Sequence, residues 1–338
     1  MSLQSLLKTA ILFIILALPV SAQEVVDDSE WNYIPDLEKT DAEARDVIGN
    51  NVMFYYDDLA HAMHYYGRIL GFKKVWEFDG RVVTYQTSPS SYITLVAKSV
   101  GLHKEDKPKT FAVAFVSEQI EEWYAYALKQ EALGNVEFFD HLDPLNGRPY
   151  HGFVLKDPEG YLLEFERFGP HEENAKLMPI LDKSPTLFPD ETQDSWRPAN
   201  IGVKASVYWM YYNDADKAGE FYEDVFGGER VVTQKNSLIY RTSNTGYVGM
   251  VRSGQGMLKA TPEKAATVSF LTSDVNPWYK FLKTKPAFEF RADSVVVERD
   301  RMNIVVGYGP ENYYIEVNGF YDIPNNKLLN DTLEKYKE

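Results

Sequence analysis

The chain has 338 residues, a formal net charge of −15, 44% hydrophobic residues and no cysteine. The absence of cysteine excludes disulfides, thiolate metal sites and cysteine nucleophiles, and the length favours about two domains with full hydrophobic cores. A surface this acidic repels nucleic acid and anionic membranes, so neither is an expected partner.

Residues 1–22 have the pattern of a secretory signal peptide. Lys8 supplies a short positive region, residues 10–20 are apolar, and Val20-Ser21-Ala22 is a small-residue cleavage site. The apolar run is short for a membrane span. We therefore expect cleavage before Gln23 and a periplasmic or secreted protein without membrane contact. An uncleaved membrane anchor is the alternative.

The next segments form two similar units. Residues 23–48 are acidic and weakly periodic, which indicates an N-terminal extension. Asp58 is a good helix N-cap and Gly71 a good helix end, so a helix is predicted between them. Alternation of apolar residues predicts strands around this helix and a second unit of the same order. The expected strands are 51–58, 81–87, 91–98, 111–117, 150–156 and 161–168, with a second helix at 120–130.

The order then recurs after a polar, proline-containing stretch at 171–200, which is interpreted as a linker. Strands and helices of the same kind follow from 205 to 320, and the tail, 323–338, is expected to be helical. Four strand-helix-strand-strand(-strand) units predict an α+β protein of two tandem domains, 49–170 and 201–322.

Two local motifs carry a family resemblance. They are the helix end YYGRILGF at 65–72 and the hairpin KDPEGYLLEFERF at 156–168, which YGPENYYIEVNGF at 308–320 repeats with Glu316 aligned on Glu164. In this order they resemble the vicinal oxygen chelate superfamily, which includes glyoxalase I, extradiol dioxygenases and bleomycin-resistance proteins. The resemblance implies that each domain is built from two βαβββ modules forming a curved mixed sheet around a cavity.

Metal-binding members of this superfamily use a His or Gln on the first strand of a module and a Glu on the last. Carried over, these positions read Asn51, about Phe111, Thr94 and Glu164 in the first domain, and Val207, Gly249, Thr267 and Glu316 in the second. One carboxylate per domain is too few to hold a catalytic divalent ion. No cofactor is therefore expected, and a divalent metal held in the first domain by Glu164 and His151 is the alternative.

His151 is the most notable histidine. Pairing the two hairpin strands across a four-residue turn puts Phe153 opposite Glu164 and His151 opposite Glu166, all on one face. Glu164 and His151 are therefore the candidate catalytic residues, as an acid–base pair. The alternative is a hydrogen bond that satisfies a buried polar wall.

Single polar and aromatic strand residues complete the set of candidates. A cavity lined by aromatic residues suits an aromatic or amphipathic molecule, although ordinary β-propensity and core filling are the simpler explanation of aromatic strands. The candidate ligand-binding residues are Asn51, Thr94, Phe153, Glu316, Tyr208, Asn303 and Arg148.

Three functions are compatible with these features. The first is an exported protein that binds a small aromatic or amphipathic molecule without a full metal site. The second is a lyase, isomerase or dioxygenase acting in the first-domain cavity, with a metal or the Glu/His pair. The third is a scaffold with collapsed cavities. The sequence leaves open whether the protein is an enzyme, and whether it is a monomer or a homodimer.

Overall fold

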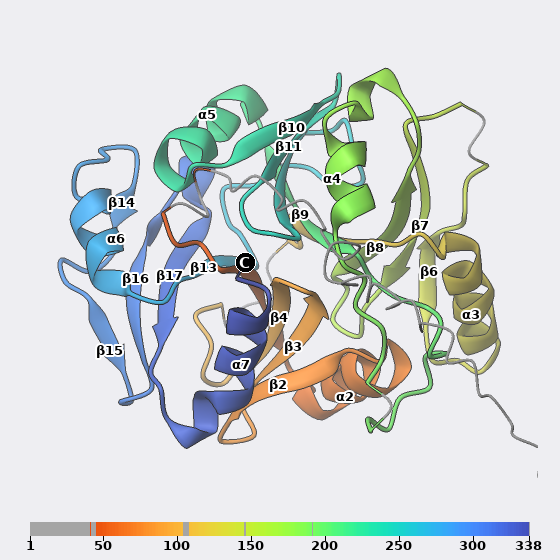
Figure 1. The fold of residues 1–338 in the computed structure, drawn as a ribbon, viewed down its shortest axis with the longest axis horizontal. Coiled ribbons are helices and arrows are strands. Elements are labelled where there is room, and N and C mark those ends of the chain that lie inside the picture. Colours follow the sequence, from red (N-terminus) through yellow and green to blue (C-terminus); the bar gives the residue numbers. More distant parts are fainter. Residues whose placement is uncertain (1–40, 42–44, 104–107, 145–146, 191, 338) are drawn as a thin grey trace, which may run out of the picture. The chain divides into compact units, whose positions relative to one another are not determined.

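The computed structural model describes residues 41, 45–103, 108–144, 147–190 and 192–337 (Figure 1). The expected signal peptide and most of the expected extension lie outside these residues. Within the described part of the chain, no helix combines the length and the apolar character needed to cross a membrane.

The first half of the chain contains two modules of the expected order. Module 1 consists of β1 (Gly49–Tyr56), α2 (Leu59–Met63), η2 (His64–Ile69), β2 (Lys73–Phe78), β3 (Val82–Ser88) and β4 (Ser91–Ala97). Module 2 consists of β5 (Phe111–Val116), α3 (Ile120–Ala132), β6 (Glu137–Asp140), β7 (Tyr150–Lys156) and β8 (Leu162–Phe168).

The second half repeats the order. Module 3 consists of β9 (Ala205–Tyr212), α5 (Ala215–Phe226), β10 (Glu229–Thr233), β11 (Ser237–Arg241) and β12 (Gly246–Arg252). Module 4 consists of β13 (Ala266–Leu271), α6 (Val275–Leu282), β14 (Glu289–Phe290), β15 (Val296–Glu298), β16 (Met302–Tyr308) and β17 (Tyr314–Phe320). The remaining helices are η3 (Glu172–Asn174), α4 (Leu177–Lys183), η4 (Pro310–Asn312), η5 (Pro324–Asn326) and α7 (Lys327–Lys335).

An aspartate begins the helix in three of the four modules. The carboxylates of Asp58, Asp214 and Asp274 each accept a hydrogen bond from a backbone N–H two or three residues further on. These bonds satisfy donors that the first helical turn leaves unpaired. The first helix widens into the π-helical turn η2, where Leu70 N–H bonds to Tyr65 C=O at 2.8 Å.

The modules pair through their first strands, and the pairing does not follow their order in the sequence. Sheet A has the order β14-β16-β17-β13-β1-β4-β3-β2, with β15 beside β16, because β1 and β13 are antiparallel neighbours. Sheet B has the order β10-β11-β12-β9-β5-β8-β7-β6, through β5 and β9. The α+β fold of four modules and two sheets is confirmed. However, each sheet joins one module from 49–170 to one from 201–322, which the sequence interpretation had kept apart (Figure 1).

One face of each sheet contributes to a common core. This core contains Phe54 of β1, Phe111 of β5, Tyr208 of β9 and Phe270 of β13, together with helix residues from all four modules. The aromatic strands therefore fill a core, which is the more ordinary of the two readings of the sequence. The other face of each sheet, which does not contribute to this core, lines a cavity.

The expected linker is more structured than its composition suggests. Leu177 and Leu181, one helical turn apart, are buried on α4. Further on, the Gln193 side-chain amide donates to the Phe72 carbonyl at 2.6 Å, and the Arg197 guanidinium lies over the Phe72 ring. The end of the segment therefore packs against module 1, whereas α4 packs with buried residues of modules 2 and 3.

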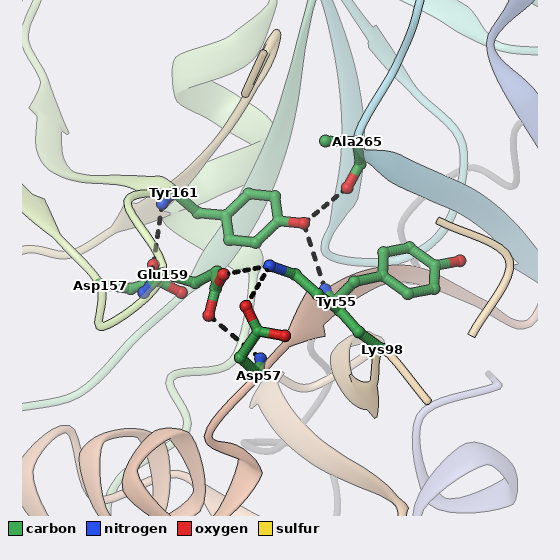
Figure 2. Close-up of polar contacts among 7 residues, drawn as sticks. All are labelled: Tyr55, Asp57, Lys98, Asp157, Glu159, Tyr161 and Ala265. Carbon is green, nitrogen blue, oxygen red and sulfur yellow. Dashed lines mark hydrogen bonds and ion pairs between the residues drawn. The ribbon is translucent and has the colours of Figure 1, made fainter. Parts of the chain in front are cut away.

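The turn between β7 and β8 ties the two sheets together (Figure 2). The Tyr161 hydroxyl donates to the Ala265 carbonyl at 2.6 Å and accepts from the Tyr55 N–H at 3.1 Å. Beside it, the buried Lys98 ammonium binds the carboxylates of Asp57 and Glu159. Residues of the DPEG turn and Tyr161 beside it therefore connect sheet B to sheet A.

Module 4 repeats this arrangement at the turn between β16 and β17. The Tyr313 hydroxyl donates to the Thr110 carbonyl at 2.8 Å and accepts from the Tyr211 N–H at 2.8 Å. Glu311 accepts from the Asp214 N–H, as Glu159 does from the Asp57 N–H. The hairpin of sheet B thus bonds to sheet A, and the hairpin of sheet A bonds to sheet B.

Candidate functional site

The first candidate site is a cavity of about 220 Å³ on the free face of sheet A, called cavity A here. Strands of module 1 and of module 4 both line it. Its walls are mainly apolar, and its polar residues lie on the central strands. The lining residues that matter below are Asn51, Tyr55, Trp76, Phe78, Arg81, Thr94, Glu298, Arg299, Arg301, Glu316, Asn318 and Phe320.

Asn51 and Thr94 form one side of the polar floor. The Thr94 hydroxyl donates to Asn51 Oδ1 at 3.0 Å and is paired with the Thr84 hydroxyl at 2.8 Å. The side chains of Asn51 and Thr94 are buried. These neighbours fix their orientation at the bottom of the cavity.

Glu316 forms the other side of the floor. The Asn318 side-chain amide donates to Glu316 Oε2 at 3.0 Å, and the Ser269 hydroxyl donates to Asn318 Oδ1 at 2.6 Å. Desolvation, reinforced by Glu298, raises the pKa of the half-buried Glu316 to about 7, against the opposing hydrogen bond from Asn318. Near neutral pH this carboxyl can therefore either donate or accept a proton.

Arginines surround the mouth of cavity A. Arg299 and Arg301 lie over the Phe78 ring at 4.6 and 4.3 Å. Arg299 is paired with Glu298 at 3.1 Å, and Arg81 with Asp79 at 3.0 Å. Among the described residues, no carboxylate lies within ion-pair distance of Arg301.

Two adjacent residues at this mouth hold unusual backbone conformations. Arg299 and Asp300 have φ values of 49° and 54° in the tight turn between β15 and β16. Consecutive non-glycine residues in the left-handed region carry strain. A tight hairpin turn has both central residues at positive φ, and this one is closed by the bond from the Arg301 N–H to the Glu298 carbonyl at 3.0 Å.

The donor set of cavity A does not fit a tightly bound divalent metal. Glu316 supplies one carboxylate, and the neighbouring groups are the amides and hydroxyls of Asn51, Thr94 and Asn318. Within the described residues, no group of three or more His, Asp and Glu side chains is placed to hold a metal ion. Catalytic zinc and non-haem iron sites use three protein ligands, chiefly imidazoles and carboxylates.

The second candidate site is a cavity of about 290 Å³ on the free face of sheet B, called cavity B here. Glu164 and Glu166 point into it from β8, and Trp209 and Tyr211 from β9. Desolvation raises the pKa of Glu164 to about 7, with Asp140 adding to the shift and the Trp209 indole opposing it. Desolvation and Glu164 hold the pKa of Glu166 well above its usual value. Each sheet therefore has a cavity beside its glutamate, which does not fit the hypothesis of a scaffold with collapsed cavities.

The predicted register of the hairpin, which put His151 opposite Glu166 and on the same face as Glu164, is wrong. The turn closes on a pair between Asp157 and Tyr161, so Val154 lies opposite Glu164 and Gly152 opposite Glu166. The loop has three residues instead of the expected four. Its last residue, Gly160, has a φ of +87°. A shift of one residue reverses the face of every side chain on a strand.

His151 consequently lies on the helix-covered side of sheet B. Its Nε2 atom is 3.8 Å from Glu121 of α3, and Phe153 packs in the common core on the same side. Neither lines cavity A or cavity B. An acid–base or metal-ligand role together with Glu164 is therefore not supported.

Of the other predicted ligand-binding residues, three line cavity A and three do not. Asn51, Thr94 and Glu316 meet in cavity A, although they were expected in different domains. Tyr208 is buried in the common core, where its hydroxyl donates to the Asn50 and Tyr92 carbonyls. Asn303 accepts from the Tyr321 hydroxyl on the far face of β16, and Arg148 is exposed and paired with Asp143.

Sequence reasoning missed Asn318 and the three arginines as a group. Asn318 could have been predicted, because strand alternation places it on the same face as Glu316, two residues away. Arg81 and Arg299 come from turns of different modules, and only the pairing of modules 1 and 4 brings them together.

Comparisons with known proteins agree with this architecture. Residues 50–165 match the family model of the Glyoxalase/Bleomycin resistance protein/Dioxygenase superfamily. This part of the chain therefore belongs to that superfamily, and the resemblance inferred from the sequence is confirmed. No curated protein matches the chain significantly.

Solved structures extend the same fold over all four modules. Glyoxalase I from Zea mays has 13% sequence identity, covers 88% of this chain and 99% of its own, and gives a TM-score of 0.56. A Bacillus subtilis protein assigned only provisionally as a dioxygenase has 14% identity, covers 86% and 90%, and gives a TM-score of 0.58. At this level of identity the likeness establishes the fold alone.

Proposed function

We propose that the protein binds a small amphipathic anion in cavity A without a catalytic metal. The observation that carries the proposal is the combination of apolar walls, a rim of arginines and a buried polar floor with a single carboxyl group. Binding pockets of this kind are mostly apolar, with a few polar groups that fix orientation.

Each part of the cavity has a role in this binding mode. Trp76, Phe78 and Phe320 contact the apolar body of the ligand. Arg301 supplies the positive charge for its anionic group, since Arg81 and Arg299 already have carboxylate partners. Asn51 and Glu316 bond to a polar group at the inner end.

Calorimetric titration with 3-phenylpropionate and its neutral amide tests this proposal. We expect the carboxylate to bind more tightly than the amide. Replacement Arg301→Ala should weaken carboxylate binding by roughly tenfold or more, which is the usual worth of a charge-assisted hydrogen bond. Arg81→Ala is the matched control, because Arg81 is engaged by Asp79. Equal binding of acid and amide, or binding of neither, would overturn the proposal.

We also propose that the protein acts outside the cytoplasm. The support is the order of a positive, an apolar and a small-residue region in residues 1–22. Cell fractionation with N-terminal sequencing tests it, and a mature chain beginning at Gln23 is the expected result. A cytoplasmic chain that retains residues 1–22 would contradict it.

A further inference from the structure

Cavity B differs from cavity A in charge, although the two occupy equivalent places in the two sheets. Glu164 of sheet B corresponds to Glu316 of sheet A, since they pair with Ala114 and Ser269 at the same register. Two residues further, Glu166 of sheet B stands where sheet A has Asn318.

The environment of this second position decides what cavity B can hold. In sheet A, Asn318 is bonded to both Ser269 and Glu316. In sheet B, Glu166 is 1% exposed, and its Oε1 atom has no hydrogen-bond partner within the described residues. A buried carboxyl oxygen without a partner is costly, so a ligand that bonds to it is favoured.

Aromatic rings complete the surroundings of the two carboxyls. Trp209, Tyr211 and Tyr150 line the same cavity, and the buried Trp209 Nε1 atom makes no regular hydrogen bond within the described residues. Of the charged residues that line the cavity, Glu164, Glu166 and Glu173 are acidic and Lys235 is basic. Aromatic faces and carboxylates together attract cations.

We propose that cavity B is a second binding site, specific for an organic cation such as an amine or a quaternary ammonium group. Glu164 and Glu166 face its charge, and Trp209 and Tyr211 contact its body. A metal ion is a poorer occupant, because two carboxylates with indole and phenol neighbours do not complete the shell of oxygen ligands that hard cations require. This site is independent of the anion site in cavity A.

The proton state of the pair gives the proposal a distinctive signature. A cation favours the ionised form of both carboxyls, so its binding should release a proton near neutral pH. Asp140 also raises the pKa of Glu164, and Glu173 and Lys235 line the same cavity. None of the three is a hydrogen-bond partner of Glu166 Oε1 within the described residues. Binding should weaken as the pH falls and the carboxyls become protonated.

The test is calorimetry with benzyltrimethylammonium, and with benzyl alcohol as the neutral probe, in two buffers of different ionisation enthalpy. We expect saturable binding of the cation alone, with proton release. Glu164→Gln and Glu166→Gln should each weaken it by roughly tenfold or more. Glu316→Gln, in the other cavity, is the matched control and should leave it unchanged.

Three results would overturn the proposal. They are no binding of the cation to the wild-type protein, binding without proton release, and stoichiometric displacement of the cation by Ca²⁺ or Mn²⁺. Since all three are measured on the wild-type chain, the proposal stays testable even if a glutamine variant folds poorly.

Discussion

The Tyr161 hydroxyl accepts a hydrogen bond from the Tyr55 N–H at 3.1 Å, although the two residues belong to different sheets. Tyr313 and Tyr211 form the same bond at 2.8 Å in the opposite direction between the sheets. Each hydroxyl also donates to the residue that precedes the neighbouring first strand, Ala265 or Thr110. The geometry that the two hairpins share therefore serves to join the sheets.

The first prediction concerns these two hydroxyls. Tyr161→Phe and Tyr313→Phe should each lower the free energy of unfolding by about 1–3 kcal/mol, because a buried N–H and a buried carbonyl lose their partner. Denaturant unfolding measures the change. Tyr308→Phe is the control, since the Tyr308 hydroxyl makes no hydrogen bond within the described part of the chain. Loss of stability equal to that of the control would show that the bonds between the sheets contribute little.

The second prediction concerns the pH dependence of stability. The pKa of Glu316 is raised from 4.5 to about 7 in the folded protein, so the folded state binds more protons than the unfolded state between these values. Stability from this group is therefore present below about pH 4.5 and is lost as the pH rises to about 7. Glu316→Gln should flatten this part of the stability curve and raise the melting temperature at alkaline pH.

Thermal unfolding across that pH range provides the check. Asp143→Asn is a suitable control, because the Asp143 carboxylate is exposed and paired with Arg148. If the slope of the wild type and of Glu316→Gln is the same, Glu316 does not titrate as its surroundings in cavity A indicate.

The third prediction concerns metals. The floor of cavity A offers one carboxylate and several neutral oxygens, and Glu298 at the mouth is paired with Arg299, so treatment with a chelator should leave the melting temperature unchanged. Added Zn²⁺ or Mn²⁺ should not raise it. A metal-dependent increase that Glu316→Gln abolishes would mean that the amide and hydroxyl groups of the floor complete a metal site after all.

The fourth prediction concerns the wall of cavity B. A Cβ atom on Gly249 would lie 2.1 Å from the Trp209 ring. Gly249→Ala should displace this ring, lower the free energy of unfolding by about 1–3 kcal/mol and weaken binding of benzyltrimethylammonium. An alanine variant with unchanged stability and unchanged affinity would show that Trp209 moves aside freely and is not a fixed wall.

The sequence was sufficient to predict the modules, because caps such as Asp58 and the strand patterns are local signals. The pairing of modules was not predictable in this way. β1 bonds to β13 and β5 to β9, and nothing in the four similar modules specifies which first strands meet. Local patterns determine elements, whereas the pairing depends on contacts between residues far apart in the sequence, such as that of Thr267 with Tyr55, which are 212 positions apart.

The same limitation applied to the candidate site. Asn51, Thr94 and Glu316 were each selected from their strands, but they were assigned to two cavities, since the module pairing was unknown. The error at His151 came from the length of one turn, which has three residues instead of the expected four and ends on Gly160 in a left-handed conformation. One residue of register was enough to turn His151 away from Glu164.

The most direct test of metal-free ligand binding in cavity A is native mass spectrometry of the protein purified from its own host without chelator. We predict that the wild-type protein retains a small organic acid, that no divalent metal is present in stoichiometric amount, and that Arg301→Ala loses the adduct. A stoichiometric metal, or an organic adduct that Arg301→Ala retains, would contradict the central proposal.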